Sequence, residues 1–182
     1  MKAVICHGTL GSPSGNWFPW LRDILIEKGW DVSVPTLPTP DNQTIDGWIT
    51  TLKNQKVALD DVDIIIGHSL GATFILRLLG LGLINPQKTI LVSGLIGEIN
   101  NAEYDQLNAP FINSPYGWSD IRRASQNFVL LHGDNDPYVP LKQAEEIAKN
   151  LNIPLYAIKD GGHLNAEAGY REFPEILEHL ND

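Results

Sequence analysis

The sequence predicts an α/β protein with a parallel sheet of about six strands and helices on both faces. Short apolar runs rich in β-branched residues alternate with longer segments in which apolar residues recur every three or four positions. No repeat, low-complexity tract or linker interrupts this alternation. Such alternation is typical of parallel sheets whose helical crossovers cover both faces. A single domain covering residues 1–182 is expected, since a chain of this length can bury one sizeable core.

The first elements follow from a short apolar run and a helical pattern. Residues 3–6 predict a strand, and the glycine-rich segment 7–15 predicts a loop. Asn16 is expected to cap the next helix, because its side-chain oxygen can accept a backbone N–H of the first turn. The helical pattern ends at Gly29, and the alternating residues 31–34 predict the second strand.

The next elements are separated by a proline-rich loop. Prolines in 35–40 exclude a helix there. Thr44 is expected to cap a helix over 44–52, whose apolar residues fall on one face. The apolar run 62–66 predicts a strand buried on both faces, and 70–81 predicts an apolar helix directly after it.

The second half of the chain contains an irregular insert. Residues 89–92 predict the fourth strand, after which the segment 95–126 has weak periodicity and scattered Asn, Pro and Gly. Because a long insert in a compact domain is usually functional or partly helical, we expect a small cap or lid region. The remaining strands and helices are expected at 128–131, 144–151, 154–158 and 173–180.

A Gly-x-Ser-x-Gly sequence, from Gly67 through Ser69 to Gly71, lies between the strand 62–66 and the helix 70–81. A sharp strand-to-helix turn brings backbones close together, so the positions that flank the serine need very small residues. Such a turn presents the serine hydroxyl at the sheet edge and is the nucleophile elbow of α/β-hydrolases. The motif could also occur by chance in a glycine-rich loop, but its flanking strand and helix favour the elbow. We therefore expect a compact α/β-hydrolase.

A serine nucleophile needs a base, and the chain offers five histidines. In this fold class the acid precedes the base in the chain, which excludes His7 and His132. His68 lies inside the elbow, and its side chain is expected to point away from the serine. His179 is expected to be a solvated helical residue. His163 remains; the two glycines before it allow its ring to lie over the sheet edge.

The orienting acid is expected after the strand 128–131. Asp134 and Asp136 both lie there, and we favour Asp136 because Pro137 fixes the chain directly after it. Asp134 could be a turn residue. Asp160 is a weaker third candidate, because it lies too close to the histidine along the chain.

Acyl transfer also needs backbone N–H donors for the oxyanion of the tetrahedral intermediate. One is expected from Leu70, the residue after the nucleophile, and the other from the loop after the first strand. In that loop either Thr9 or Leu10 could supply the donor, and the sequence does not separate them. The loop could also be a turn that only connects strand and helix.

The insert 95–126 is expected to wall a small, largely apolar substrate pocket. It contains large apolar residues, among them Phe111 and Trp118, in an otherwise polar segment. We expect these two to contact the substrate. The alternative is that they anchor the insert on the core.

The composition limits the kind of partner. A formal charge of −9 argues against nucleic acid or an anionic membrane as the main partner. The single cysteine, Cys6, excludes an internal disulfide and a cysteine-based metal cluster. No signal peptide or 18-residue apolar span is present, so a cytoplasmic protein is expected. No protein partner is predicted.

Several segments spread over nearly the whole chain carry a family resemblance, namely 7–8, 16–21, 67–71, 91–94, 134–140 and 161–163. With them, the chain resembles the small serine hydrolases related to retinoblastoma-binding protein nine. The resemblance implies a reduced α/β-hydrolase with six parallel strands and a triad of Ser69, Asp136 and His163. It also implies esterase or amidase activity on small acyl groups. Retinoblastoma binding is not implied, because the Leu-x-Cys-x-Glu motif is absent around Cys6.

The sequence therefore predicts a serine hydrolase that cleaves small acyl esters or amides through an acyl-enzyme. This chemistry needs no metal and no organic cofactor. A thioesterase or a peptidase with the same triad is an alternative. A non-catalytic binding module on a hydrolase scaffold is a second alternative, because fold alone does not establish activity.

Overall fold

The computed structural model describes residues 1–57 and 59–180. Its centre is a six-stranded sheet in the order β2-β1-β3-β4-β5-β6. Every neighbouring pair of strands is parallel, which confirms the predicted fold class. The strands are β1 (Lys2–Cys6), β2 (Asp31–Ser33), β3 (Ile64–His68), β4 (Lys88–Val92), β5 (Asn127–Gly133) and β6 (Tyr156–Ile158).

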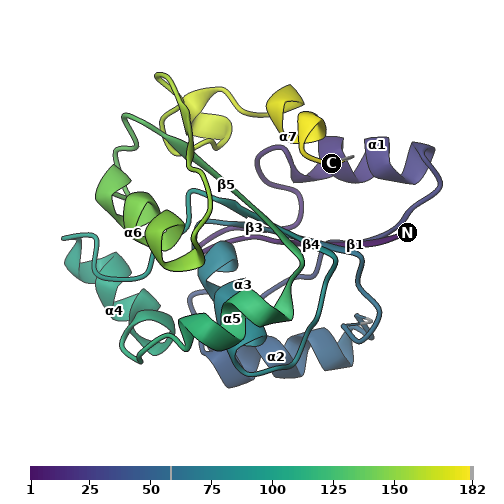
Figure 1. Ribbon diagram of the computed structural model, residues 1–182, viewed down its shortest axis with the longest axis horizontal. Helices are drawn as coiled ribbons and strands as arrows, with labels where there is room; N and C mark the ends of the chain where they lie inside the picture. Colours follow the sequence, from purple (N-terminus) through teal and green to yellow (C-terminus); the bar gives the residue numbers. More distant parts are fainter. Residues whose placement is uncertain (58, 181–182) are drawn as a thin grey trace.

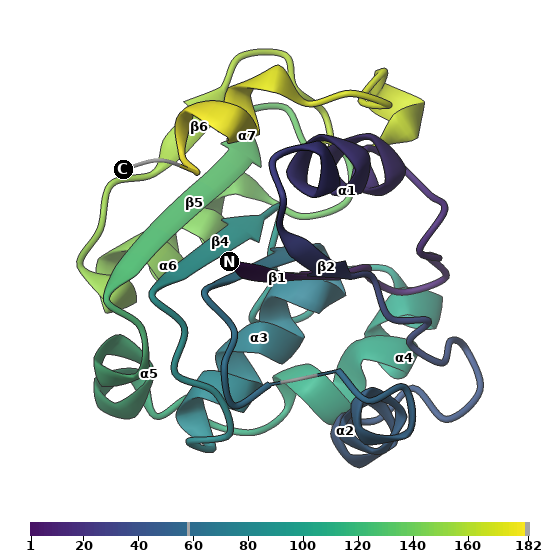
Figure 2. The same cartoon turned by 90° about the vertical axis from the view of Figure 1, so that its right-hand side faces the viewer.

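Helices cover both faces of this sheet (Figures 1 and 2). On one face lie α1 (Phe18–Glu27) and α7 (Pro174–Glu178), and a short 3-10 helix, η1 (Ala166–Ala168), precedes α7. The helices of the other face are α2 (Ile45–Asn54), α3 (Leu70–Gly80), α4 (Ala102–Ile112), α5 (Trp118–Ala124) and α6 (Leu141–Leu151).

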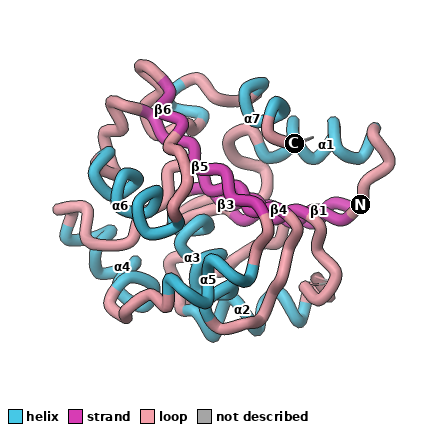
Figure 3. The backbone as a smooth tube through the Cα atoms, viewed as in Figure 1, coloured by secondary structure: helices cyan, strands magenta, loops and turns pink. Residues whose placement is uncertain are grey.

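The apolar strands separate two hydrophobic layers. Ile64 and Ile66 of β3 pack toward α1 and α7, whereas Ile65 between them packs toward α2 and α3. Side chains alternate between the faces of a strand, so a strand buried on both faces must be apolar throughout. Figure 3 shows the strands between the two helical layers.

Most of the predicted elements are present, but their ends differ. Thr44 caps α2 as expected, accepting the Gly47 N–H at 3.0 Å. Asn16 does not cap α1: Trp17 occupies that position, and Asn16 has a φ of +49°. The Asn16 side chain instead accepts the N–H of Ala166 at 3.0 Å, so it joins two loops rather than starting a helix.

The insert 95–126 contains regular structure that the sequence predicted only in general terms. It folds into α4 and α5, and Asn101 caps α4 by accepting the Tyr104 N–H. The strand expected at 62–66 begins at Ile64 and continues to His68, up to the elbow. Among the described helices, none is both long and apolar enough to cross a lipid bilayer.

The sheet order brings the candidate loops to one edge. The strand order reverses at β1, because β2 lies on one side of β1 and β3 lies on the other. In such sheets ligands bind at the carboxyl ends of the strands near this switch point. The loops after β1, β3, β5 and β6 all leave from that edge.

Candidate active site

Ser69 lies in a tight turn between β3 and α3. Its backbone has φ +57° and ψ −127°, a conformation that non-glycine residues rarely adopt. A Cβ on Gly67 would lie 2.6 Å from the backbone of Gly71, and a Cβ on Gly71 would lie 2.3 Å from the Cys6 carbonyl oxygen. The two glycines are therefore required by backbone contacts on both sides of the serine, as the elbow predicts.

The structure brings His163 and Asp136 together. His163 Nδ1 donates to Asp136 Oδ2 at 2.7 Å, and the Asp136 side chain is completely buried. Asp136 Oδ1 accepts the N–H groups of Tyr138 and Val139 at 2.9 and 3.0 Å. Burial acts to raise the pKa of the Asp136 carboxyl, but these hydrogen bonds and the His163 ring hold it below its ordinary value. Asp136 is therefore ionised at neutral pH, and His163 carries its proton on Nδ1.

The other two candidate acids do not contact His163. Asp134 is exposed, and its Oδ1 accepts the Asp160 N–H at 2.8 Å. This contact ties the loop after β5 to the loop after β6. Asn135 adds a second tie by accepting the Gly162 N–H at 2.7 Å. Both contacts position the loop that carries His163, a role that the sequence did not indicate.

His68 anchors the backbone of His163. Its Nε2 lies 2.8 Å from the His163 carbonyl oxygen, which can only accept, so the proton must be on Nε2. Ser93 Oγ donates to the same oxygen at 3.2 Å. Burial, assisted by the nearby His163 ring, lowers the pKa of His68 to about 3, so this histidine stays neutral. The elbow motif alone does not reveal this positioning role.

The remaining histidines have structural contacts. His7 Nε2 accepts the Leu37 N–H at 3.0 Å, and burial lowers the pKa of His7. His132 Nε2 donates to the Val139 carbonyl at 3.0 Å and lies 3.5 Å from Asp136. Burial also lowers the pKa of His132. His179 follows α7, where its ring lies 4.5 Å from that of Tyr156.

A cavity of about 240 Å³ borders both Ser69 and His163. The insert contributes part of its wall, as the sequence predicted, but through different residues. They are Leu95, Ile99, Tyr104 and Asn108.

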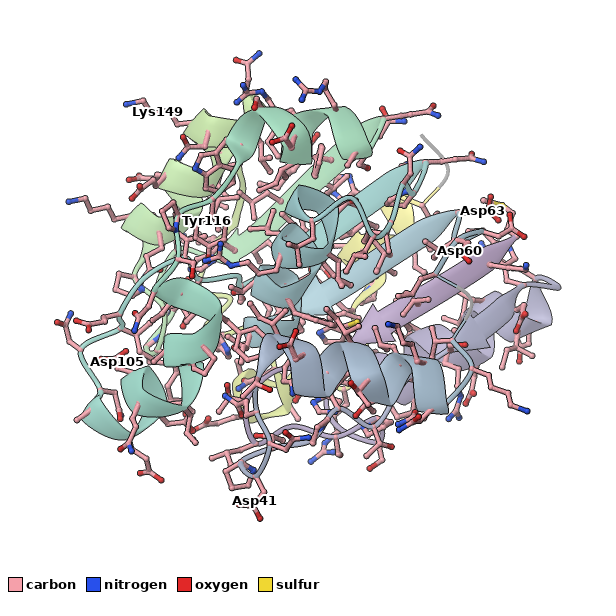
Figure 4. All side chains as sticks on the ribbon, turned by 90° about the horizontal axis from the view of Figure 1, so that it is seen from below. Asp41, Asp60, Asp63, Asp105, Tyr116 and Lys149 are labelled. Atoms are coloured by element: carbon pink, nitrogen blue, oxygen red, sulfur yellow. The ribbon has the colours of Figure 1, made fainter. Side chains whose placement is uncertain are left out.

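Phe111 and Trp118, the residues expected to contact substrate, do not line this cavity. Phe111 is fully buried, with its ring 4.7 Å from that of Trp48 on α2 and 6.1 Å from that of Phe74 on α3. Trp118 stacks on Tyr116. Tyr116 lies in the connection between α4 and α5 (Figure 4). The cavity borders only the earlier turns of α4, whereas its last turn rests on the core. Both aromatic residues therefore anchor the insert.

The loop after β1 lies against the elbow. A Cβ on Gly8 would lie 2.8 Å from Ser69 Cβ and 3.0 Å from the Leu70 nitrogen, so only glycine allows this approach. Leu10 N–H donates to Thr39 Oγ1 at 2.8 Å and is already used. Within the described residues, the N–H groups of Thr9 and Leu70 have no protein acceptor. These two donors remain for a ligand beside Ser69.

The parallel sheet, the serine in a strained strand-to-helix turn and the adjoining histidine–aspartate pair define an α/β-hydrolase. The sequence matches the model of a family described as serine hydrolase over residues 3–182, so the chain belongs to the serine hydrolase family. Across the described residues, no group of three or more His, Cys, Asp or Glu side chains is arranged to hold a metal ion.

Individual relatives agree with this membership. YdeN of Bacillus subtilis is 26% identical over 181 residues, covering 98% of this chain and 94% of YdeN. The serine hydrolase RBBP9 of Rattus norvegicus is 26% identical over 179 residues, covering 97% of this chain and 91% of that protein. The predicted resemblance is thus confirmed.

Solved structures show the same fold. The crystal structure of the B. subtilis ydeN gene product has a TM-score of 0.86 and 24% identity, covering 98% of this chain and 96% of that chain. The α/β-hydrolase MGS-MChE2, from a metagenome of lagoon sediments at Mar Chica, Morocco, has a TM-score of 0.71 and 21% identity. The match covers 98% of this chain and 89% of that chain.

Proposed function

We propose that the protein hydrolyses small acyl esters or amides through an acyl-enzyme on Ser69. The observation that carries this proposal is the buried pair of His163 and Asp136, whose histidine borders the same cavity as the elbow serine. Burying a carboxylate costs free energy unless hydrogen bonds compensate for it. Packing of the core therefore does not explain why Asp136 is buried beside His163. Membership of the serine hydrolase family supports the same chemistry.

The protonation states define how the pair would act. Because His163 Nδ1 donates to the ionised Asp136, its Nε2 keeps a lone pair. Nε2 takes the Ser69 proton as the hydroxyl oxygen attacks the substrate carbonyl, and the charged ring is stabilised by Asp136. The protonated ring then donates to the leaving group, and water cleaves the acyl-enzyme by the same steps in reverse order.

The oxyanion is held by the two backbone donors beside the serine. Leu70 N–H lies at the start of α3, where the helix dipole also favours negative charge. Thr9 N–H is the partner that we favour over Leu10, whose N–H is bound to Thr39. A cavity of about 240 Å³ suits a short acyl group rather than a long chain.

Two matched variants test this mechanism with p-nitrophenyl acetate and butanoate. Asp136→Asn should lower kcat by about ten-thousandfold, because the amide favours the wrong histidine tautomer. Asp134→Asn keeps the acceptor for the Asp160 N–H and should retain most of the activity. Thioesters and p-nitroanilides of the same acyl groups, measured alongside, rank the leaving groups.

Absence of hydrolysis by the unaltered protein on every substrate would contradict the proposed function and favour a binding module. An equal loss in the two aspartate variants would contradict the assignment of Asp136.

A further inference from the structure

A chain of buried polar side chains joins three segments around the cavity. Gln43, before α2, and Asn108, on α4, are only 4% and 2% exposed. Their amide groups meet the Thr9 hydroxyl, in the loop that passes the elbow. Buried amides are stable only when their donors and acceptors are paired, so the direction of each hydrogen bond can be worked out.

A backbone carbonyl fixes the orientation of the Gln43 amide. Thr39 Oγ1 accepts the Leu10 N–H, and its own proton can be donated to Gln43 Oε1 at 2.5 Å. The Leu107 carbonyl can only accept, so the group 2.9 Å from it must be Gln43 Nε2. With Nε2 at Leu107, the Gln43 atom that faces Thr39 is Oε1, and the Thr39 hydroxyl can donate to it.

This orientation fixes Asn108 in turn. Gln43 Nε2 lies 3.3 Å from the Asn108 amide, so the nearer Asn108 atom must be the acceptor Oδ1. The Thr9 hydroxyl donates to the same oxygen at 2.5 Å. If the Asn108 amide were rotated by 180°, its Nδ2 donor would face the Gln43 Nε2 donor. The Asn108 Nδ2 group therefore points away from the network.

Asn108 borders the cavity, and its Nδ2 has no hydrogen-bond acceptor within residues 1–57 and 59–180. Among the described residues Nδ2 is not one of the fully buried unpaired atoms, so it is open to the cavity, where a substrate acceptor can bind it in place of water. The network thus positions the Asn108 Nδ2 donor at the cavity but contains no acceptor for it.

The sheet order places this donor on the acyl side of the reacting carbonyl. Asn108 is tied to Thr9, which follows β1, whereas His163 follows β6 on the opposite side of β3. The leaving group must lie near His163, which protonates it. The Asn108 side of the cavity then receives the acyl group.

We propose that Asn108 Nδ2 binds a hydrogen-bond acceptor in the acyl group and selects short oxygen-bearing acyl groups over plain alkyl ones. The inference rests on the proposed hydrolysis at Ser69. It adds a substrate-contacting side chain and a substrate class to that reaction.

A matched substrate pair tests the selection. p-Nitrophenyl methoxyacetate and p-nitrophenyl butanoate differ only by an ether oxygen in place of one methylene. Their ratio of kcat/KM, compared between proteins, cancels the intrinsic reactivity of the two esters. Asn108→Asp keeps an acceptor for Thr9 and Gln43 but lacks the NH2 group. It should lower the methoxyacetate-to-butanoate ratio by about threefold to tenfold.

Two further variants distinguish the loss of the NH2 donor from the negative charge that Asn108→Asp adds. Asn108→Ala removes the donor without adding a carboxylate, and it should lower the ratio to a similar extent. Asn101→Asp makes the same charge change at the start of α4, at a residue that does not line the cavity, and its Oδ1 contact to the Tyr104 N–H at 3.3 Å is retained. In this control the ratio should stay at the unaltered value. Melting temperatures show whether each variant is folded.

Three results would overturn the assignment of Asn108 while leaving hydrolysis intact. They are an unchanged ratio in both Asn108 variants, an equal fall for both esters, and the same shift in Asn101→Asp. If the unaltered protein hydrolyses neither ester, no ratio exists, and the proposed function is overturned together with this inference.

Discussion

The protonation state of His68 is determined by its buried surroundings. Its ring packs edge-on against Trp17 and lies 4.9 Å from the ring of His163, and its Nε2–H holds the His163 backbone. Protonation of His68 would place a charge in this buried position. The residue therefore supports the site only in its neutral form.

This neutral state predicts a dependence of stability on pH. Unfolding restores the His68 pKa from about 3 to its ordinary value of 6.5, so between these values the unfolded chain binds a proton that the folded chain does not. The stabilisation is complete above that window and is lost as the pH falls through it. From pH 7 to pH 5 the free energy of unfolding should fall by about 2 kcal/mol through this residue.

His68→Gln keeps an N–H donor but does not titrate. Urea unfolding at pH 7 and pH 5 should show a smaller fall for this variant than for the unaltered protein. His7 and His132 contribute to the fall in both proteins and cancel in the comparison. An identical fall in the two would show that His68 is not buried in its neutral form.

At the scale of the element, α3 depends on its close approach to β1. A Cβ on Gly71 would lie 2.3 Å from the Cys6 oxygen and 2.7 Å from the His7 oxygen. Both are backbone atoms at the end of a central strand, so neither can move without displacing the sheet. The start of α3, with Ser69 before it, would have to shift instead.

Gly71→Ala should therefore destabilise the protein by about 2 kcal/mol or more and lower ester hydrolysis. Gly80→Ala, in the last turn of the same helix, is the control, because the nearest atom to its Cβ lies at 3.4 Å on the Ile121 side chain. That substitution should be neutral or stabilise by up to about 1 kcal/mol, since alanine favours helix. Urea unfolding measures both; equal stabilities would contradict the contact at Gly71.

At the scale of the molecule, one aromatic cluster joins the insert to the body. Trp48 of α2, Phe74 of α3 and Phe111 of α4 contact one another through their rings. Arg77 of α3 strengthens the same junction, because its Nε donates to the Phe111 carbonyl at 2.7 Å. The wall of the cavity on α4 is positioned by this cluster.

Phe111→Ala should lower the free energy of unfolding by about 3–5 kcal/mol, the usual cost of removing a buried phenylalanine. Because Phe111 does not border the cavity, the ranking of p-nitrophenyl esters by acyl-chain length should stay the same. Trp118→Ala, at a half-buried residue, should cost less. A changed ranking together with an unchanged melting temperature would contradict the structural role and show that Phe111 contacts the substrate.

The sequence predicted the features that local patterns encode. The apolar strands, the capped helix at Thr44 and the glycines around Ser69 each follow from a short stretch of residues. The pairing of His163 with Asp136, rather than Asp134, followed from chain order and Pro137. Their role in catalysis stays a prediction until activity is measured.

Contacts between distant segments could not be predicted in the same way. Large apolar residues in an irregular insert suit a pocket or a core equally well, and only the position of α4 places Phe111 in the core. The network through Gln43 and Asn108 joins two loops and α4, which no sequence pattern connects. The helix cap expected at Asn16 failed for the same reason, since its partner lies at Ala166.

The central claim is that Ser69 is the nucleophile. A fluorophosphonate probe forms a stable covalent adduct only with a serine that an adjacent base activates. Intact mass and peptide mapping should find one adduct per chain, on Ser69, and none on Ser69→Ala with an unchanged melting temperature. Undiminished labelling of folded Ser69→Ala, or no labelling of the unaltered protein, would contradict the claim.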